Sequence, residues 1–124
     1  MKRVLIVDDS PTEMHLVTEI LRRNGFEVLG ADNAEQGLRL AREKQPDLVL
    51  MDVVMPGLNG FQATRQLTRD PNTAQIPVIM LTTKSQETDR VWGVRQGALG
   101  YLTKPVDERL LLETIREVLA GKPA

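Results

Sequence analysis

The sequence predicts an α/β fold in which one doubly wound, five-stranded parallel sheet is flanked by five helices. Short apolar runs rich in β-branched residues alternate along the chain with longer segments of helical period, which is typical of successive βα units. Three of these runs are apolar throughout, as expected for strands that helices cover on both faces. Because 124 residues suit one compact domain, residues 1–124 are predicted to be a single domain.

The strands are expected where these apolar runs lie. The run after the basic start of the chain, and the two runs in its middle, show no alternation with polar residues. The last run is short and ends near a Lys-Pro pair. The five predicted strands are Val4–Val7, Phe26–Leu29, Leu48–Met51, Val78–Leu81 and Leu99–Leu102.

The first helix has a clear start signal. Ser10 is the expected N-cap, Pro11 takes the first helical position, and Glu13 is the expected capping-box partner. The helix should end at Gly25. Its apolar side is predicted from residues that share one face, namely Met14, Val17 and Leu21, with Leu16 and Ile20 beside them.

Caps and helix breakers delimit the other four helices. The second should start near Asp32 or Asn33 and end before Gln45-Pro46, and the third lies between Leu58 and Leu67. The fourth is expected from Ser85 to Gly97, with Val91 and Val94 on its buried side. The fifth starts at Asp107 and turns these residues inward: Leu111, Ile115, Val118 and Leu119.

The composition excludes several classes of protein. With 16 basic and 17 acidic residues and no long block of one sign, no nucleic-acid surface is expected. The absence of cysteine excludes disulfides and thiolate sites and fits a reducing compartment. The apolar run Val4–Val7 is too short for a signal peptide, so neither export nor membrane insertion is expected, and the predicted location is cytoplasmic.

Polar residues gather where the predicted strands end, which is the edge at which open α/β sheets bind ligands. Asp8 and Asp9 follow the first strand and Asp52 the third, while Thr82 ends the fourth and Lys104 follows the fifth. Converging carboxylates repel one another unless a cation offsets them, and this favours a hard divalent ion, Mg²⁺. Helix capping would explain Asp8 or Asp9 alone, but it is a weaker explanation for Asp52.

These residues, in this order and spacing, resemble the receiver domains of two-component response regulators over nearly the whole chain. The single motifs are weak, but five in sequence are specific. The resemblance implies a flavodoxin-like sheet in the strand order 2-1-3-4-5. It rests on the pair Asp8-Asp9, on Asp52 followed by Met55-Pro56-Gly57 and Gly60, on Thr82, and on Tyr101 before Thr103-Lys104-Pro105.

The resemblance implies a phosphoryl switch. Asp52 would be the phosphoacceptor, and Asp9, Asp52 and the backbone carbonyl of Val54 would bind Mg²⁺, with Asp8 acting through a coordinated water. Lys104 would neutralise phosphoryl oxygens.

In the same resemblance, Thr82 would donate its hydroxyl to the phosphoryl group. This contact would be coupled to inward rotation of Tyr101, which reshapes the face of the fourth helix, fifth strand and fifth helix. The Lys104-Pro105 bond is expected to be cis.

Three positions depart from the common pattern or tune the site. Thr83 stands where the family commonly has alanine or glycine, and Val54 and Lys84 lie two residues past Asp52 and Thr82. An apolar Val54 cannot orient water, so slow self-dephosphorylation is expected.

His15 is rejected as a phosphoryl donor or metal ligand, because it points away from the apolar stripe. Trp92 is a candidate anchor for a protein partner.

Two rival functions fit the sequence less well. A phosphatase of the haloacid dehalogenase type needs a second aspartate where Val54 stands, and flavin binding needs a loop without the two anions Asp8 and Asp9. No turnover enzyme is therefore expected, and a pseudo-receiver or a phosphate sink stays open.

The partners follow from the resemblance, which is strongest for stand-alone receivers of the chemosensory system that controls type IV pili and twitching motility. It implies a chemotaxis-type histidine kinase as donor and a downstream protein target. Because the chain ends soon after the fifth helix, no output domain is expected, and the protein should be a monomer or weak dimer.

Overall fold

Five parallel strands form one sheet in the order β2-β1-β3-β4-β5 in the computed structural model, which describes residues 1–121. This order and the flanking helices confirm the predicted fold class, and the last three residues of the predicted domain lie outside the described part. Within residues 1–121, no helix is long and apolar enough to cross a membrane. The strands are β1 (Arg3–Val7), β2 (Glu27–Ala31), β3 (Leu48–Met51), β4 (Val78–Thr82) and β5 (Gly100–Thr103).

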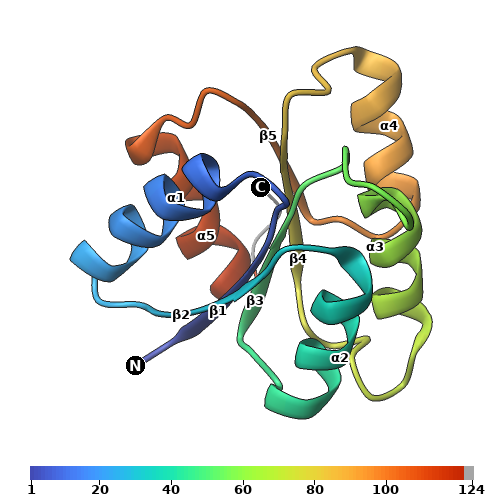
Figure 1. The fold of residues 1–124 in the computed structure, drawn as a ribbon, viewed down its shortest axis with the longest axis horizontal. Helices are drawn as coiled ribbons and strands as arrows, with labels where there is room; N and C mark the ends of the chain where they lie inside the picture. Colours follow the sequence, from blue (N-terminus) through green and yellow to red (C-terminus); the bar gives the residue numbers. More distant parts are fainter. Residues whose placement is uncertain (122–124) are drawn as a thin grey trace.

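The helices cover both faces of the sheet, α1 and α5 on one side and α2, α3 and α4 on the other (Figure 1). The helices α1 to α4 each join two parallel strands, and α5 follows the last strand. Because helices cover both faces, the sheet is doubly wound. Their bounds are α1 (Pro11–Arg23), α2 (Ala34–Lys44), α3 (Gly60–Arg69), α4 (Glu87–Arg95) and α5 (Glu108–Leu119).

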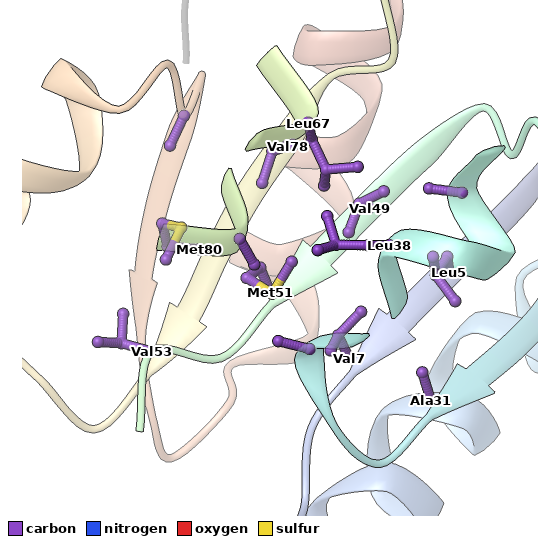
Figure 2. Close-up of a cluster of buried hydrophobic side chains, with 14 of the residues drawn as sticks. Leu5, Val7, Ala31, Leu38, Val49, Met51, Val53, Leu67, Val78 and Met80 are labelled. Atoms are coloured by element: carbon purple, nitrogen blue, oxygen red, sulfur yellow. The ribbon is translucent and has the colours of Figure 1, made fainter. Parts of the chain in front are cut away.

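Two apolar clusters hold the layers together. Every residue of β3 and β4 is buried, which confirms the expectation from their unbroken apolar runs. Alternate strand residues point to opposite faces. Val49, Met51, Val78 and Met80 pack toward α2 and α3 with Leu38 and Leu67 (Figure 2). The other cluster joins the sheet to α1 and α5 through Val4, Ile6, Leu50, Ile79, Val17, Leu21, Leu111 and Ile115.

Side-chain caps start most helices, with one difference from the prediction. The Ser10 hydroxyl accepts a hydrogen bond from the Glu13 N–H at 3.3 Å, so Ser10 is the N-cap of α1. Glu13 is not a capping-box partner, because the Ser10 N–H donates instead to Asp8 Oδ1 at 2.9 Å. The reciprocal pair is found at α3, where Asn59 and Gln62 each accept from the other's backbone N–H.

Three predicted core residues are exposed. Leu16 lies on the solvent side of α1, since Val17, Ile20 and Leu21 already form the buried stripe. Val91 and Val94 do not mark a buried side of α4, so that prediction is wrong.

The physical reason is that α4 approaches the sheet through its smallest residue. Gly93 is the one buried residue between Glu87 and Arg95. A glycine at the contact lets the helix come close and leaves the larger side chains on either side of it in solvent.

Candidate functional site

Backbone hydrogen bonds continue past the ends of β1 and β3 and fix two acidic residues at the carboxyl edge of the sheet. The Asp8 N–H donates to the Ala31 carbonyl at 3.0 Å, and the Asp52 N–H donates to the Val7 carbonyl at 3.0 Å. Both aspartates therefore keep the geometry of strand residues although neither belongs to a strand. Their side chains face the crevice where sheets of this topology bind ligands.

Three carboxylates meet there. Asp8, Asp9 and Asp52 each offer an oxygen, and these oxygens lie within 4.8 Å of one another. Asp8 and Asp52 are only 5% and 7% exposed, whereas Asp9 is open to solvent. Backbone donors hold the two buried groups: the Ser10 N–H reaches Asp8 Oδ1 at 2.9 Å, and the Val54 N–H reaches Asp52 Oδ1 at 3.4 Å.

The Lys104 ammonium bridges the two buried carboxylates. Lys104 Nζ lies 2.7 Å from Asp8 Oδ2 and 3.1 Å from Asp52 Oδ2. Burial lowers the pKa of Lys104, but the hydrogen bond that its ammonium donates to Asp8 and the charges of Asp52 and Asp8 more than offset this, so its pKa is raised and the ammonium stays charged. The peptide bond between Lys104 and Pro105 is cis, as expected.

The charge of the cluster fits a hard cation. Three carboxylates face one ammonium, which leaves two negative charges without a partner inside the cluster. Their oxygens are the ligand type that Mg²⁺ prefers, and the exposed Asp9 gives an ion access from solvent. The donor set therefore fits the predicted metal.

Thr82 lies fully buried at the end of β4. Its Oγ1 accepts a hydrogen bond from the Lys84 N–H at 3.3 Å, which leaves the hydroxyl proton available for a further acceptor. Thr83 and Lys84 are exposed directly after Thr82, and Val54, two residues past Asp52, is 53% exposed. The three positions predicted to tune the site are thus exposed and close in the chain to the site residues Asp52 and Thr82.

Tyr101 is buried on β5 and connects the site to α4. Its hydroxyl donates to the Lys84 carbonyl oxygen at 2.6 Å. Burial and the charge of Asp89 raise the pKa of Tyr101 to about 12, although the nearby Arg90 lowers it. The ring therefore stays a neutral hydrogen-bond donor at physiological pH.

Sequence reasoning missed two residues of α4 that contact Tyr101. The Arg90 guanidinium carbon lies 5.4 Å from the centroid of the ring, and its Nη1 donates to the Tyr101 carbonyl at 3.2 Å. Gly93 lies against the same ring. A glycine inside a helical pattern was the available signal, because such a residue often marks a close approach.

The remaining predicted residues lie on the surface. His15 is exposed on α1 and does not belong to the acidic cluster. Trp92 is 47% exposed on α4. A groove between α4, β5 and α5 is lined by three of the exposed apolar residues, Val94, Leu99 and Leu110, but not by Trp92.

An acidic cluster with a bridging lysine and a buried threonine, at the carboxyl edge of a sheet ordered 2-1-3-4-5, is the arrangement expected of a signalling receiver domain. Comparison with known families agrees, since residues 4–116 match the response regulator receiver domain. The chain belongs to this family. Receiver domains take phosphoryl groups from histidine kinases, act on downstream targets and generally bind Mg²⁺ in an acidic pocket.

Individual proteins of known name are similar to this chain over most of its length. Protein PilH of Pseudomonas aeruginosa is 66% identical over 121 residues, which cover 98% of this chain and 100% of PilH. The transcriptional regulator RpaA of Synechocystis is 41% identical over 96% of this chain, but the chain spans only 49% of RpaA. Among solved structures, the chemotaxis protein CheY4 of Vibrio cholerae superposes with a TM-score of 0.89 at 32% identity, covering 95% of this chain and 98% of CheY4.

Proposed function

We propose that this protein is a stand-alone receiver that accepts a phosphoryl group from a histidine kinase on Asp52, in a Mg²⁺-dependent reaction, and thereby controls a protein partner. The observation that carries the proposal is the environment of Asp52. Its carboxylate is buried beside Asp8, within reach of Asp9, and is bound by the Lys104 ammonium at 3.1 Å.

Asp52 is the proposed nucleophile. One carboxylate oxygen attacks phosphorus, the bond between phosphorus and the donor's imidazole nitrogen breaks, and the electron pair of that bond stays on the nitrogen. Lys104, already held at Asp52 Oδ2, neutralises charge on the transferring oxygens. The protein changes its own state in this reaction and turns over no free substrate, so it is not a turnover enzyme.

Asp9, Asp52 and the Val54 carbonyl would hold Mg²⁺, with Asp8 acting through water. The ion would supply positive charge that stabilises the phosphoryl oxygens. Asp8 accepts hydrogen bonds from the Ser10 N–H and from Lys104, and Asp52 accepts them from the Val54 N–H and from the same lysine. The water-mediated role of Asp8 is therefore proposed from the resemblance to receiver domains and not from these contacts.

The output is proposed to pass through Thr82 and Tyr101. Thr82 has a hydroxyl proton to donate to the new phosphoryl group, and its Oγ1 is linked to Lys84, whose carbonyl binds Tyr101. A phosphoryl group on Asp52 would thus favour one arrangement of the β4–α4 segment and of α4. The partner would bind the face formed by α4, β5 and α5, with the exposed Trp92 of α4 as an anchor.

The biological setting is proposed from the relative that covers the whole chain. The 66% identity to PilH supports a role in the chemosensory system of type IV pili and twitching motility. A chemotaxis-type histidine kinase in the cytoplasm would be the donor. The target would be a component or regulator of the pilus motor.

Labelling by acetyl phosphate, read as a shifted band on a phosphate-affinity gel, tests the proposal. We expect a shifted band with Mg²⁺, none with EDTA, and none for Asp52→Asn. Asp47→Asn is the matched control: Asp47 lies at the opposite end of β3, where its Oδ2 binds the Arg3 N–H, and this variant should label normally. A wild-type protein that shows no shifted band with Mg²⁺ would instead be a pseudo-receiver.

A further inference from the structure

The Tyr101 ring lies at the junction of three segments. Its hydroxyl is bound by the Lys84 carbonyl in the β4–α4 segment, and its own backbone belongs to β5. From α4, Arg90 lies over the ring face and donates to the Tyr101 carbonyl. One residue of β5 is therefore held by α4 through both its side chain and its backbone.

Gly93 provides the space for the ring. A Cβ atom at this position would lie 3.0 Å from Tyr101 Cδ2 and 3.2 Å from Cε2, closer than side chains normally pack. Gly93 is also the one buried residue of α4 between Glu87 and Arg95. Within α4, only Gly93 is buried against the rest of the protein, and the Tyr101 ring is the nearest side chain to it.

We propose that Arg90 is a positioning residue that clamps the Tyr101 ring into the seat left by Gly93, so that α4 and the ring move together. The consequence for output rests on the proposed phosphoryl switch. The clamp itself is a property of the unmodified protein.

Arginine suits this role better than lysine. The planar guanidinium can lie over an aromatic face and still direct an N–H to a carbonyl, because its donors project from the edge of the plane. A lysine ammonium is a strongly hydrated point charge and cannot make both contacts in the same way. Arg90→Lys should therefore keep the charge and weaken the clamp, whereas Arg90→Met removes the charge and both contacts at similar length.

The sequence makes a direct measurement possible, because Tyr101 is the only tyrosine. Fluorotyrosine incorporation gives one ¹⁹F signal that reports the ring. We expect one buried signal in the wild type, and a second, solvent-exposed signal in Arg90→Met that is weaker in Arg90→Lys. Arg95→Met, an exposed arginine of the same helix, is the control and should match the wild type.

The tyrosinate absorbance titration separates positioning from a simple charge effect. Arg90 lowers the pKa of Tyr101, so its removal without movement of the ring would raise the pKa further above about 12. Movement of the ring into solvent removes the larger contribution of burial, and the pKa then falls toward its ordinary value of 10.0. A fall in Arg90→Met supports the clamp, and a rise or no change overturns it.

Gly93→Ala tests the close contact between Gly93 and the Tyr101 ring without removing a charge. Alanine favours a helix interior more than glycine does, so α4 should keep its helical structure. We expect the ring to shift by a few tenths of an ångström and its ¹⁹F signal to move, while a wild-type ¹⁹F spectrum would contradict this contact. These measurements need neither Mg²⁺ nor a phosphoryl donor. Failure of Asp52 labelling would therefore refute the proposed function and leave the clamp standing, and the reverse also holds.

Discussion

At the scale of single residues, the carboxylates of the site repel one another, and a single ammonium partly offsets this repulsion. Asp8 and Asp52 are buried close together, and Lys104 stabilises both through short contacts. The residue types and their strand-end positions were predictable from the sequence. The bridging of both carboxylates by one ammonium was not, because it depends on where the segment after β5 carries the Lys104 side chain. The same holds for Arg90, whose ring contact joins residues of different elements.

The lifetime of the phosphoryl group is the first prediction at this scale. Val54 is exposed two residues past Asp52, and its side chain offers attacking water no hydrogen bond. Thr83, which follows Thr82, is larger than the small residue common in the family. We expect slow loss of phosphate from the labelled protein, followed on phosphate-affinity gels after the donor is removed. Val54→Asn should speed this loss by about 10-fold, since an amide can orient water.

Two results bear on that expectation. A wild-type half-life of seconds with Mg²⁺ would contradict it. Leu110→Asn places the same amide at an exposed apolar position on α5, away from the acidic cluster, and should leave the lifetime unchanged.

Tyr101 gives a pH dependence with a definite sign. Its pKa is raised from 10.0 to about 12 in the folded protein, so the unfolded chain loses this proton first. The stabilising contribution of the neutral phenol is therefore complete below pH 10 and is lost as the pH rises toward about 12. The free energy of unfolding of Tyr101→Phe, measured with urea, serves as the reference. The advantage of the wild type over this variant should shrink across that range, and a constant difference would mean that the ring is not buried.

At the scale of elements, the presence and order of the strands and helices were predictable from the sequence. The residues at which they begin and end, and the side of each helix that is buried, were less so. The β2 strand lies at Glu27–Ala31 rather than Phe26–Leu29, because its register is set by pairing with β1 and not by its own apolar run. Similarly, α4 is shorter than Ser85 to Gly97 suggested. Its exposed valines follow from a helix that meets the sheet through Gly93. Apolar periodicity cannot anticipate a contact made by a glycine.

The start of α3 offers a prediction for an element that supports the site. A Cβ atom at Gly60 would lie 1.9 Å from the Asp52 carbonyl oxygen, which no side chain tolerates, and the Gly60 N–H donates to the Val53 carbonyl at 3.0 Å. Gly60→Ala must therefore displace the backbone that carries Asp52 and Val54. We expect Mg²⁺ affinity, measured by calorimetry, to fall by about 10-fold or more.

Gly37→Ala is the matched control for this effect. Its Cβ would lie 2.7 Å from Val7 Cγ2, so it should also destabilise the fold, but the clash involves a core side chain rather than the site backbone. Its Mg²⁺ affinity should stay near that of the wild type. Equal losses of affinity in both variants would show that general destabilisation, and not the position of Asp52, explains the result.

At the scale of the whole molecule, the topology explains why so much could be predicted from the sequence. A parallel sheet places the carboxyl ends of its strands at one edge, so residues far apart in the chain are expected together once the strands are assigned. Asp8, Asp52 and Thr82 meet in this way although up to 74 residues separate them. What topology leaves undetermined is the orientation of side chains between layers. For this reason the contacts of Arg90 and Gly93 were not predicted, and the prediction for Val91 and Val94 was wrong.

The same convergence predicts that Mg²⁺ stabilises the whole fold. The acidic cluster draws on β1 and β3, and it exists only when these strands pair, so the unfolded chain should bind the ion poorly. At about 100 times Kd, Mg²⁺ should raise the free energy of unfolding by about 2.7 kcal/mol, and EDTA should remove this gain. Urea unfolding followed through Trp92, the only tryptophan, measures the effect.

Asp9→Asn removes one charged ligand from the exposed side of the cluster and should abolish most of the gain without lowering the stability of the metal-free protein. An Mg²⁺-dependent gain that persists undiminished in Asp9→Asn would place the ion elsewhere on the molecule.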